Sequence, residues 1–329
     1  MDPVTHSLTG LALARAGLNR AAPHATLLLI AASNAPDIDI VSGLFGTAPY
    51  LEFHRGPTHS LLFAPLCALL PVAFLRWGLR RPVPLLQGWL LSLLAIVVHL
   101  GMDFLTSYGM KPLWPLANQW TQWPVLYITD IYVIAALILS VAAPGLSGLV
   151  SSEIGAKRGT GRGWAIAAIA FILLWIAGRG LLHDRAGQML ASHVYQGRAP
   201  RRTIALPTPF NPLRWRGLVE CEGFLTEHDI HVLQEFDPDQ GTIYVQPRQT
   251  DRIAQARRAP EMKRFLDFAQ WPSFRLVPLE RPAGAVRIDV RDLRFPTGFE
   301  AMVELDATGQ VMEEDVTISG RLRDNSRRP

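Results

Sequence analysis

Long apolar runs fill the first half of the chain and are separated by short polar connections. Two short apolar helices are expected first, at Val4–Leu18 and about His24–Asn34. Four longer runs follow, at His59–Leu79, Leu85–Leu105, Leu126–Ala143 and Trp164–Leu182. Each longer run has roughly the 20 residues that a membrane-spanning helix needs, whereas the first two are too short to cross a bilayer alone. We therefore expect the short helices to form a hairpin packed against the others.

The pattern changes after about Gly187, where apolar and polar residues begin to alternate as they do in strands. Strands are expected at Thr242–Val245 and Val286–Val290, with a hairpin of Met302–Leu305 and Gln310–Met312. Glu261–Ala269 has the pattern of a short helix. The sequence thus predicts a mainly α protein. A multi-span membrane helical bundle over residues 1–186 is followed by a small α+β soluble domain over residues 187–329.

Composition supports a membrane protein and excludes some partners. Apolar residues make up 49% of the chain and charged residues 18%, and the net charge is only +4. A basic stripe interleaved with aromatic residues is absent, so we expect no nucleic-acid partner. The two cysteines allow neither a disulfide framework nor a cysteine-rich zinc site. The bilayer is the partner that the sequence itself indicates.

Positive charges predict the orientation of the bundle. One set of connections carries nearly all of them: Arg15, Arg20, Arg76, Arg80, Arg81, Lys157, Arg158 and Arg162. The opposite connections carry only Arg55 and Lys111 before the last helix. Loops rich in Lys and Arg stay in the cytoplasm. The C-terminal domain is therefore expected on the other side of the membrane, in the periplasm or outside the cell.

A histidine and an aspartate lie on one face of an otherwise apolar helix. His99 and Asp103 are four positions apart in the sequence, which places them about one helical turn apart. Ionisable groups inside a membrane segment are costly and usually functional. A metal site is one explanation, and a hydrogen-bonded pair that holds helices together is the other.

Further polar residues at helix ends favour the metal site. With the orientation above, all of them lie toward the non-cytoplasmic side: His6, Asp37, Asp39, His59, His99, Asp103 and Asp130. Imidazole and carboxylate are ligands that zinc, manganese and iron accept.

Roles follow from these positions. We expect a divalent metal, with Zn²⁺ as the first choice, to be bound by His59, His99, Asp103 and Asp37. His6 is the next candidate ligand. Asp39 is either a further ligand or the base that orients a metal-bound water. Arg55, exposed beside His59, either clamps a phosphate or faces lipid headgroups. With Asp39 and Arg55, Asp130 is the third catalytic candidate.

Four ordered blocks of sequence resemble the YdjM-like family, inner-membrane proteins described as LexA-regulated, metal-dependent hydrolases. The blocks are Asp2-Pro3-Val4-Thr5-His6-Ser7, Ala35-Pro36-Asp37-Ile38-Asp39, His54-Arg55-Gly56-Pro57-Thr58-His59-Ser60 and the segment from His99 to Gly109. The order Asp37, His59, His99, Asp103 is also similar to zinc-dependent phospholipase C. These resemblances imply a membrane metal site, and the second implies zinc and phosphoester cleavage.

Three functions are open at this point. The first is a membrane-bound, phosphoesterase-like hydrolase acting on an amphipathic or lipid-linked substrate. The second is a metal-binding membrane protein without catalysis, such as a stress-response sensor or scaffold. The third is a transporter, which the absence of a repeat and the one-sided placement of the polar groups disfavour.

Overall fold

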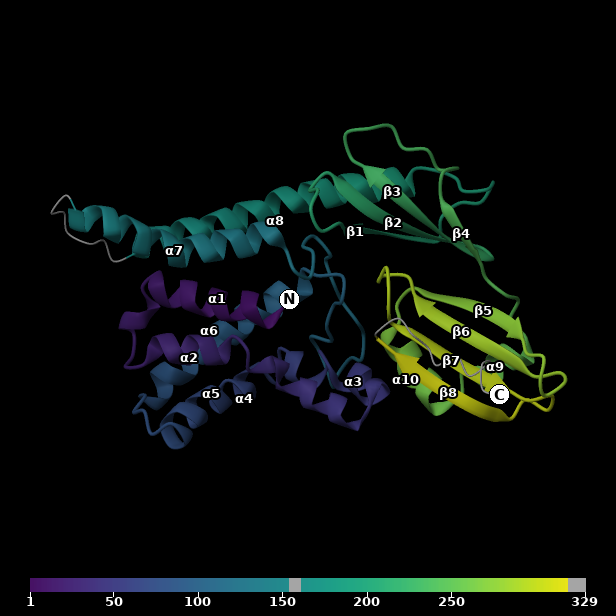
Figure 1. The fold of residues 1–329 in the computed structure, drawn as a ribbon, viewed down its shortest axis with the longest axis horizontal. Coiled ribbons are helices and arrows are strands. Elements are labelled where there is room, and N and C mark those ends of the chain that lie inside the picture. The colour runs from purple at the N-terminus through teal and green to yellow at the C-terminus, as the bar shows by residue number, and fades with distance from the viewer. Residues whose placement is uncertain (154–160, 319–329) are drawn as a thin grey trace. The chain divides into compact units, whose positions relative to one another are not determined.

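The computed structural model describes residues 1–153 and 161–318, and its contacts divide the chain into two compact units. The helical unit contains residues 1–39, 55–184 and 207–212. The second unit contains residues 40–54, 185–206 and 213–329. Residues 40–54 therefore belong, by their contacts, to the same unit as the C-terminal part of the chain. Figure 1 shows helices dominating the first half and strands the second.

Two short antiparallel helices begin the helical unit, as the sequence predicts. Helix α1 spans Pro3–Arg15 and α2 spans Ala25–Ala32. Asp2 caps α1, because its Oδ1 accepts a hydrogen bond of 3.0 Å from the Thr5 amide. The two helices pack closely, and the short 3₁₀ turn Leu18–Arg20 connects them.

The long helix α6, Leu85–Phe104, matches the predicted run and packs against α2. By contrast, the run His59–Leu79 is not one straight helix. It contains the 3₁₀ turn η3 (Pro57–His59), helices α4 (Ala64–Cys67) and α5 (Leu69–Ala73), and the π-helical turn η4 (Phe74–Gly78). Pro65 and Pro71 explain the breaks, because proline lacks an amide donor and clashes with the preceding turn.

Helices α7 (Ile131–Glu153) and α8 (Arg162–Ala191) are antiparallel neighbours in Figure 1. Helix α7 starts later than predicted, because the amides of Val125 and Leu126 bond to the Leu105 carbonyl instead. Among the described residues, α6 and α8 are long and apolar enough to cross a membrane, and counting two bent helix pairs gives up to four spans. The expected multi-span bundle therefore has two to four candidate spans among the described residues.

The cytoplasmic end expected from the charges can be followed within the helical unit. The Arg15 guanidinium donates to the carbonyl of Val141 at 3.1 Å, and Arg162 Nε donates to the Ala16 carbonyl at 2.9 Å. These bonds gather the end of α1, the later part of α7 and the start of α8 at one end of the bundle. Lys157 and Arg158 lie outside the described residues.

The second unit contains more β structure than the predicted small α+β domain. One sheet has the order β1-β2-β3-β4 and the other β5-β6-β7-β8. The first sheet consists of Arg202–Pro207, Arg214–Cys221, Phe224–His231 and Thr242–Val245. The second consists of Pro272–Pro278, Val286–Asp292, Glu300–Leu305 and Val311–Thr317. Neighbouring strands run antiparallel, as in the pairing of Arg214 with His231 and of Val286 with Leu305.

Short helices accompany these sheets. Helix α10, Pro260–Phe268, matches the expected helix and packs on β7, β8 and α3 (Thr47–Phe53). Helix α9 spans Asp251–Ala256. The 3₁₀ segment η2, Pro36–Phe45, leads from the helical unit into α3.

Candidate metal centre

Four side chains from three segments of the helical unit meet at one point. Asp37 comes from η2, His59 from η3, and His99 and Asp103 from α6. Each offers one ligand atom, and these atoms all lie within 4.8 Å of one another. The side chains of His59, His99 and Asp103 are fully buried, whereas that of Asp37 is 18% exposed. The cluster therefore reaches the surface at Asp37.

Both histidine rings are fixed by contacts at Nδ1, which leaves Nε2 facing the other members of the cluster. His99 Nδ1 lies 2.8 Å from the Ser33 carbonyl oxygen at the end of α2. A carbonyl only accepts, so Nδ1 carries the proton and Nε2 of the neutral ring keeps its lone pair.

His59 Nδ1 lies 3.2 Å from Asp39 Oδ2. That carboxylate also accepts from Thr58 Oγ1 at 2.7 Å and from the Arg55 amide at 3.0 Å. Asp39 thus fixes the orientation of His59 in the way that carboxylates orient metal-bound histidines.

On the other side of the rings, electron-pair donors face one another. The Nε2 atoms of His59 and His99 are 3.1 Å apart. Asp103 Oδ2 lies 3.1 Å from the first and 3.4 Å from the second. Asp37 Oδ1 lies 3.5 Å from His59 Nε2 and 3.7 Å from His99 Nε2. Two imidazole nitrogens and two carboxylate oxygens are a donor set that could hold a divalent metal ion.

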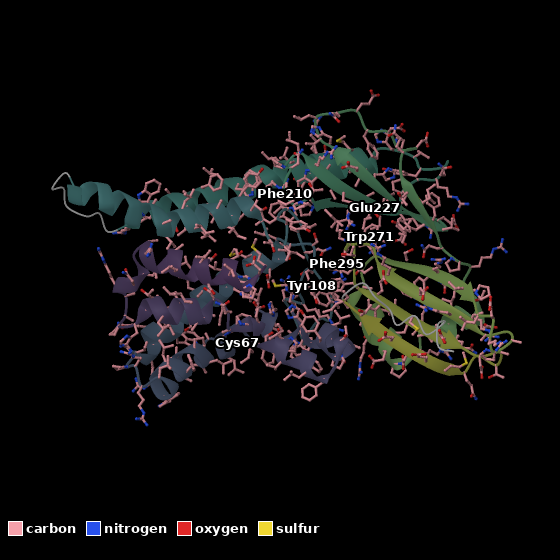
Figure 2. All side chains as sticks on the ribbon, in the orientation of Figure 1. Cys67, Tyr108, Phe210, Glu227, Trp271 and Phe295 are labelled. Atoms are coloured by element: carbon pink, nitrogen blue, oxygen red, sulfur yellow. The ribbon has the colours of Figure 1, made fainter. Side chains whose placement is uncertain are left out.

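The second oxygen of Asp103 faces positive groups. Arg55 Nη2 donates to Asp103 Oδ1 at 2.9 Å, and the Met1 amino group also contacts this oxygen. Arg55 Nη1 donates to Thr106 Oγ1 at 3.2 Å, and the guanidinium lies 4.6 Å from the centre of the Tyr108 ring, which Figure 2 labels. The expectation that Arg55 is exposed is wrong, because only 4% of it is accessible. Its φ of +60° turns the chain back toward Asp39.

His6 is buried beside the cluster. Its ring stacks on His99 with a centroid distance of 3.8 Å, and its Nε2 lies 3.4 Å from Asp103 Oδ1. Neither ring nitrogen has a hydrogen-bond partner among the described residues. An unsatisfied buried polar group is costly, so the ring nitrogens of His6 remain available to a further ligand beside the cluster.

Asp130 lies outside the four-residue cluster. Its Oδ1 accepts hydrogen bonds of 3.1 Å from the amides of Tyr132 and Val133, at the start of α7. This is the geometry of a helix N-cap. Asp130 thus caps α7, and its expected catalytic role stays a prediction.

Sequence reasoning missed the supporting atoms. The Ser33 carbonyl and the Thr106 hydroxyl carry no signal in the residue pattern, because one is backbone and the other belongs to a common polar side chain. Thr58, directly before His59, lies in a recognisable block, and its hydrogen bond to Asp39 explains its presence there.

Comparisons with known proteins match mainly the helical part of the chain. A model of the YdjM inner membrane protein family matches residues 1–186, which include every residue of the cluster. An uncharacterised Bacillus subtilis protein, YfhP, is 30% identical over 150 residues, covering 43% of this chain and 46% of its own length. The inner membrane protein YbcI of Escherichia coli is 35% identical over 98 residues, covering 28% of this chain and 56% of its own length.

The chain spans about half the length of these two relatives. No solved structure matches it. The family match covers more than half of the chain and the whole buried cluster, and the chain therefore belongs to the YdjM family of inner membrane proteins.

Proposed function

We propose that this protein is a membrane-bound, metal-dependent hydrolase that acts, like a phosphoesterase, on an amphipathic or lipid-linked substrate. One observation carries the proposal. Two histidine nitrogens and two carboxylate oxygens converge in a buried space, and both rings are already fixed by bonds at Nδ1. Such an arrangement is well prepared for a divalent cation.

Asp37, His59, His99 and Asp103 are the proposed ligands, and His6 is a candidate fifth ligand. Zn²⁺ suits two imidazoles and two carboxylates best, and Mn²⁺ and Fe²⁺ are alternatives. When bound, such a metal lowers the pKa of its water to about 7 and so supplies a nucleophile at neutral pH. Asp37 is the partly exposed member, so we expect substrate to enter on its side.

The surrounding residues have distinct proposed roles. Asp39 acts through His59 as a positioning residue, because its carboxylate is engaged by Thr58, the Arg55 amide and the imidazole. Arg55 neutralises Asp103 Oδ1 and leaves Oδ2 for the metal. Asp103 is therefore proposed as a ligand through one oxygen, not as a bridge between two ions.

An apolar groove next to the cluster supports an amphipathic substrate. The groove has a volume of about 510 Å³ and is lined by apolar side chains of α1, α6, α7 and α8. Its lining includes Met102, the neighbour of Asp103, and Thr9, one turn beyond His6 on α1. An acyl chain in this groove would bring its polar end to the level of the metal ligands.

A metal-binding protein without catalysis is the second candidate. Catalytic zinc sites leave one position open, whereas structural sites are closed by four protein ligands. The presence of four convergent side chains plus His6 favours this alternative, and the exposure of Asp37 favours the enzyme.

Activity and metal content measured together separate the two functions. The full chain, purified in a neutral detergent, is assayed against phosphatidic acid, phosphatidylglycerol and a lipid-linked diphosphate, with and without a chelator. The hydrolase proposal expects release of phosphate or headgroup that stops when the metal is removed and returns when it is restored. A metal-loaded protein that cleaves none of these substrates would favour the non-catalytic function.

We also propose that the C-terminal unit lies outside the cytoplasm. Arg55 and Lys111, the only positive residues in the opposite connections before α8, are 4% and 5% exposed. They therefore contribute little exposed positive charge to that side, so the difference in positive charge between the two ends of the bundle is larger than the sequence count suggests. Reporter fusions to the C-terminus test the orientation: a periplasm-dependent phosphatase should be active there and a cytoplasm-dependent fluorophore dark.

A further inference from the structure

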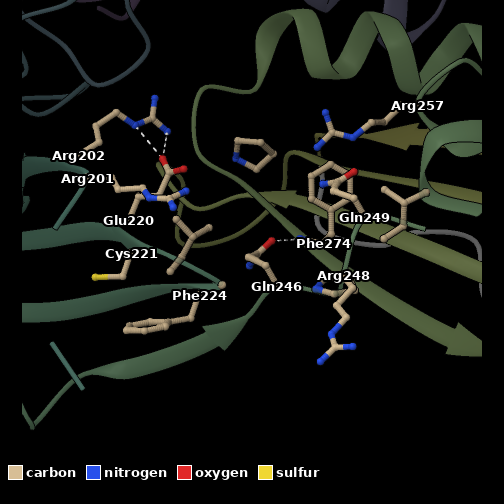
Figure 3. A pocket seen from close by; sticks show the side chains of 15 residues that line it. Arg201, Arg202, Glu220, Cys221, Phe224, Gln246, Arg248, Gln249, Arg257 and Phe274 are labelled. Atoms are coloured by element: carbon tan, nitrogen blue, oxygen red, sulfur yellow. Dashed lines mark hydrogen bonds and ion pairs between the residues drawn. The ribbon is translucent and has the colours of Figure 1, made fainter. Parts of the chain in front are cut away.

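A second concave site lies within the β-rich unit, formed where its two sheets approach each other. The cavity has a volume of about 430 Å³, within the range of small-molecule sites. Strands β1 to β3 form one wall, and helix α9 with the start of β5 forms the other. The segment Gln246–Gln249 connects the walls (Figure 3).

Positive charge dominates the lining of this cavity. Arg201, Arg202, Arg248 and Arg257 line it, and Glu220 is the only acidic residue among the described lining residues. Glu220 pairs with Arg202 at 3.0 Å, so Arg202 is neutralised. Among the residues described, neither Arg248 nor Arg257 pairs with a carboxylate. The cavity thus has an excess of positive charge over the described acidic groups that line it.

The guanidinium groups are held in place to different degrees. Arg202 donates to the Gln270 carbonyl at 2.8 Å and lies 4.1 Å from the centre of the Trp271 ring. Arg257 lies 4.6 Å from the centre of the Phe274 ring. Arg201 pairs with Glu222 at 3.3 Å, but both side chains are more than 60% exposed, so this pair exchanges easily with another anion.

The connecting segment is hydrogen-bonded to both walls of the cavity at Gln246. Gln246 Oε1 accepts from the Phe274 amide at 3.1 Å, and its Nε2 donates to the Tyr244 carbonyl at 3.0 Å and to Ser273 Oγ at 3.2 Å. These bonds join the first sheet to β5. They fix the cavity's shape and place Arg248, two residues further on, at its edge.

We propose that this cavity binds a phosphate-bearing anion. Arginine forks suit phosphate and carboxylate oxygens. Figure 3 shows Arg201 and Arg202 on one side and Arg248 and Arg257 on the other. A tetrahedral phosphate presents oxygens in several directions and can meet guanidinium groups from opposite walls, whereas a planar carboxylate serves one fork. Apolar side chains such as Phe224 and Ile253 complete the lining and suit an organic part of the ligand.

Binding to the full chain in a neutral detergent tests the proposal. Three probes are titrated by calorimetry: pyrophosphate as a free phosphate, dihexanoyl phosphatidic acid as a lipid phosphate, and citrate as a carboxylate of similar charge. We expect one of the phosphate probes to bind, and which of them binds more tightly identifies the source of the ligand. Absence of binding by both phosphate probes, or tighter binding of citrate, would overturn the proposal.

A double variant, Arg248→Gln with Arg257→Gln, should weaken phosphate binding by about tenfold or more, since each removes a charge-assisted hydrogen bond. Arg258→Gln is the matched control, because Arg258 is an exposed arginine next to Arg257 that does not line the cavity. Equal weakening by the control would show a general charge effect and contradict the site. Arg257→Lys keeps a positive charge over the Phe274 ring, so it should bind phosphate more tightly than the double variant does. Such recovery would show that the double variant loses affinity through lost charge and not through misfolding.

Discussion

Two buried polar clusters in this protein differ in how they are satisfied. In the β-rich unit, Arg294 Nη2 donates to Asp292 Oδ2 at 2.7 Å and to the Phe268 carbonyl at 3.0 Å. The Arg294 amide donates to Asp292 Oδ1 at 3.0 Å, and the guanidinium lies 4.8 Å from the centre of the Phe268 ring and 5.1 Å from that of Phe295. In this cluster the positive guanidinium faces the negative carboxylate, and each oxygen of Asp292 accepts a hydrogen bond from Arg294.

The helical unit contains the opposite case. There, the electron-pair donors of four side chains converge on one point, from His59, His99, Asp37 and Asp103. The hydrogen-bond partners of the two imidazole rings contact Nδ1, on the side away from that point. The first arrangement stabilises buried charges by pairing them with each other. The second leaves electron pairs available to a bound cation. Burial alone does not distinguish a functional cluster from a structural one, but the direction of the donors and acceptors does.

The largest expected effect is loss of the metal on Asp103→Asn. The amide oxygen is a poorer ligand than a carboxylate, and the change also removes one of the two negative charges at the site. Metal affinity should fall by more than the 10–100-fold typical of residues behind the ligands. Mass spectrometry of the metal content of the purified chain measures this.

Asp130→Asn is the matched control, with the same chemistry at an equally buried aspartate. Asparagine caps helices about as well as aspartate, so stability should be nearly unchanged and metal content full. If Asp130→Asn loses metal and Asp103→Asn keeps it, the assignment of the cluster is wrong.

Arg294→Met should test the structural cluster without touching the metal. The change leaves the carboxylate of Asp292 buried and unpaired, which costs about 3–5 kcal/mol. Hydrogen exchange in the second sheet should rise accordingly while metal content stays constant. The double change Asp292→Leu with Arg294→Met should recover much of the loss, because an apolar replacement no longer buries a lone charge.

Asp39→Asn should weaken metal binding by about 10–100-fold, because an amide orients the His59 ring less well than a carboxylate. The oxygen of the introduced amide can still accept from Thr58 and the Arg55 amide, so the fold should persist. Metal affinity and turnover should fall together, and Asp39→Glu should restore part of both. Unchanged affinity with turnover reduced by about 10²–10⁴-fold would instead make Asp39 the general base.

The comparison also explains which parts of the molecule could be predicted from the sequence. Helices with a sustained apolar pattern and a clear start, such as α1 and α6, were predictable within a few residues. The broken run around Pro65 was not, because its composition is that of a span and only the backbone chemistry of proline interrupts it. Several strands of the second unit were missed where alternation is weak, as in β5.

At the candidate site, residue types and shared depth grouped the four proposed ligands, and the structure brings them together. Their metal binding stays a prediction. The direction of Arg55 was not predictable, because it follows from a left-handed backbone turn at that residue and from the position of Asp103 on another helix. For Asp130 the sequence could not separate a capping role from a catalytic one, because the same residue type serves both; the structure shows the capping bonds, and the catalytic role stays a prediction.

The smallest expected effect concerns the packing that supports His99 from behind. A side chain at Gly10 would lie 2.7 Å from both the Leu29 carbonyl and Ser33 Oγ, so α1 and α2 touch at this glycine. Gly10→Ala must push the end of α2 away, at a cost of about 1–3 kcal/mol for overpacking. Since the Ser33 carbonyl holds His99 Nδ1, metal affinity should fall as well, by less than on Asp39→Asn.

Gly101→Ala is the control for this packing effect. Gly101 lies on α6 between His99 and Asp103, and nothing stands within 4 Å of the added carbon among the described residues. The change should leave metal affinity intact and stabilise the helix slightly, by up to about 1 kcal/mol. Thermal unfolding beside metal titration of the two glycine variants measures both effects. Equal loss of metal in both would show that α6 itself, not its support by α2, controls the site.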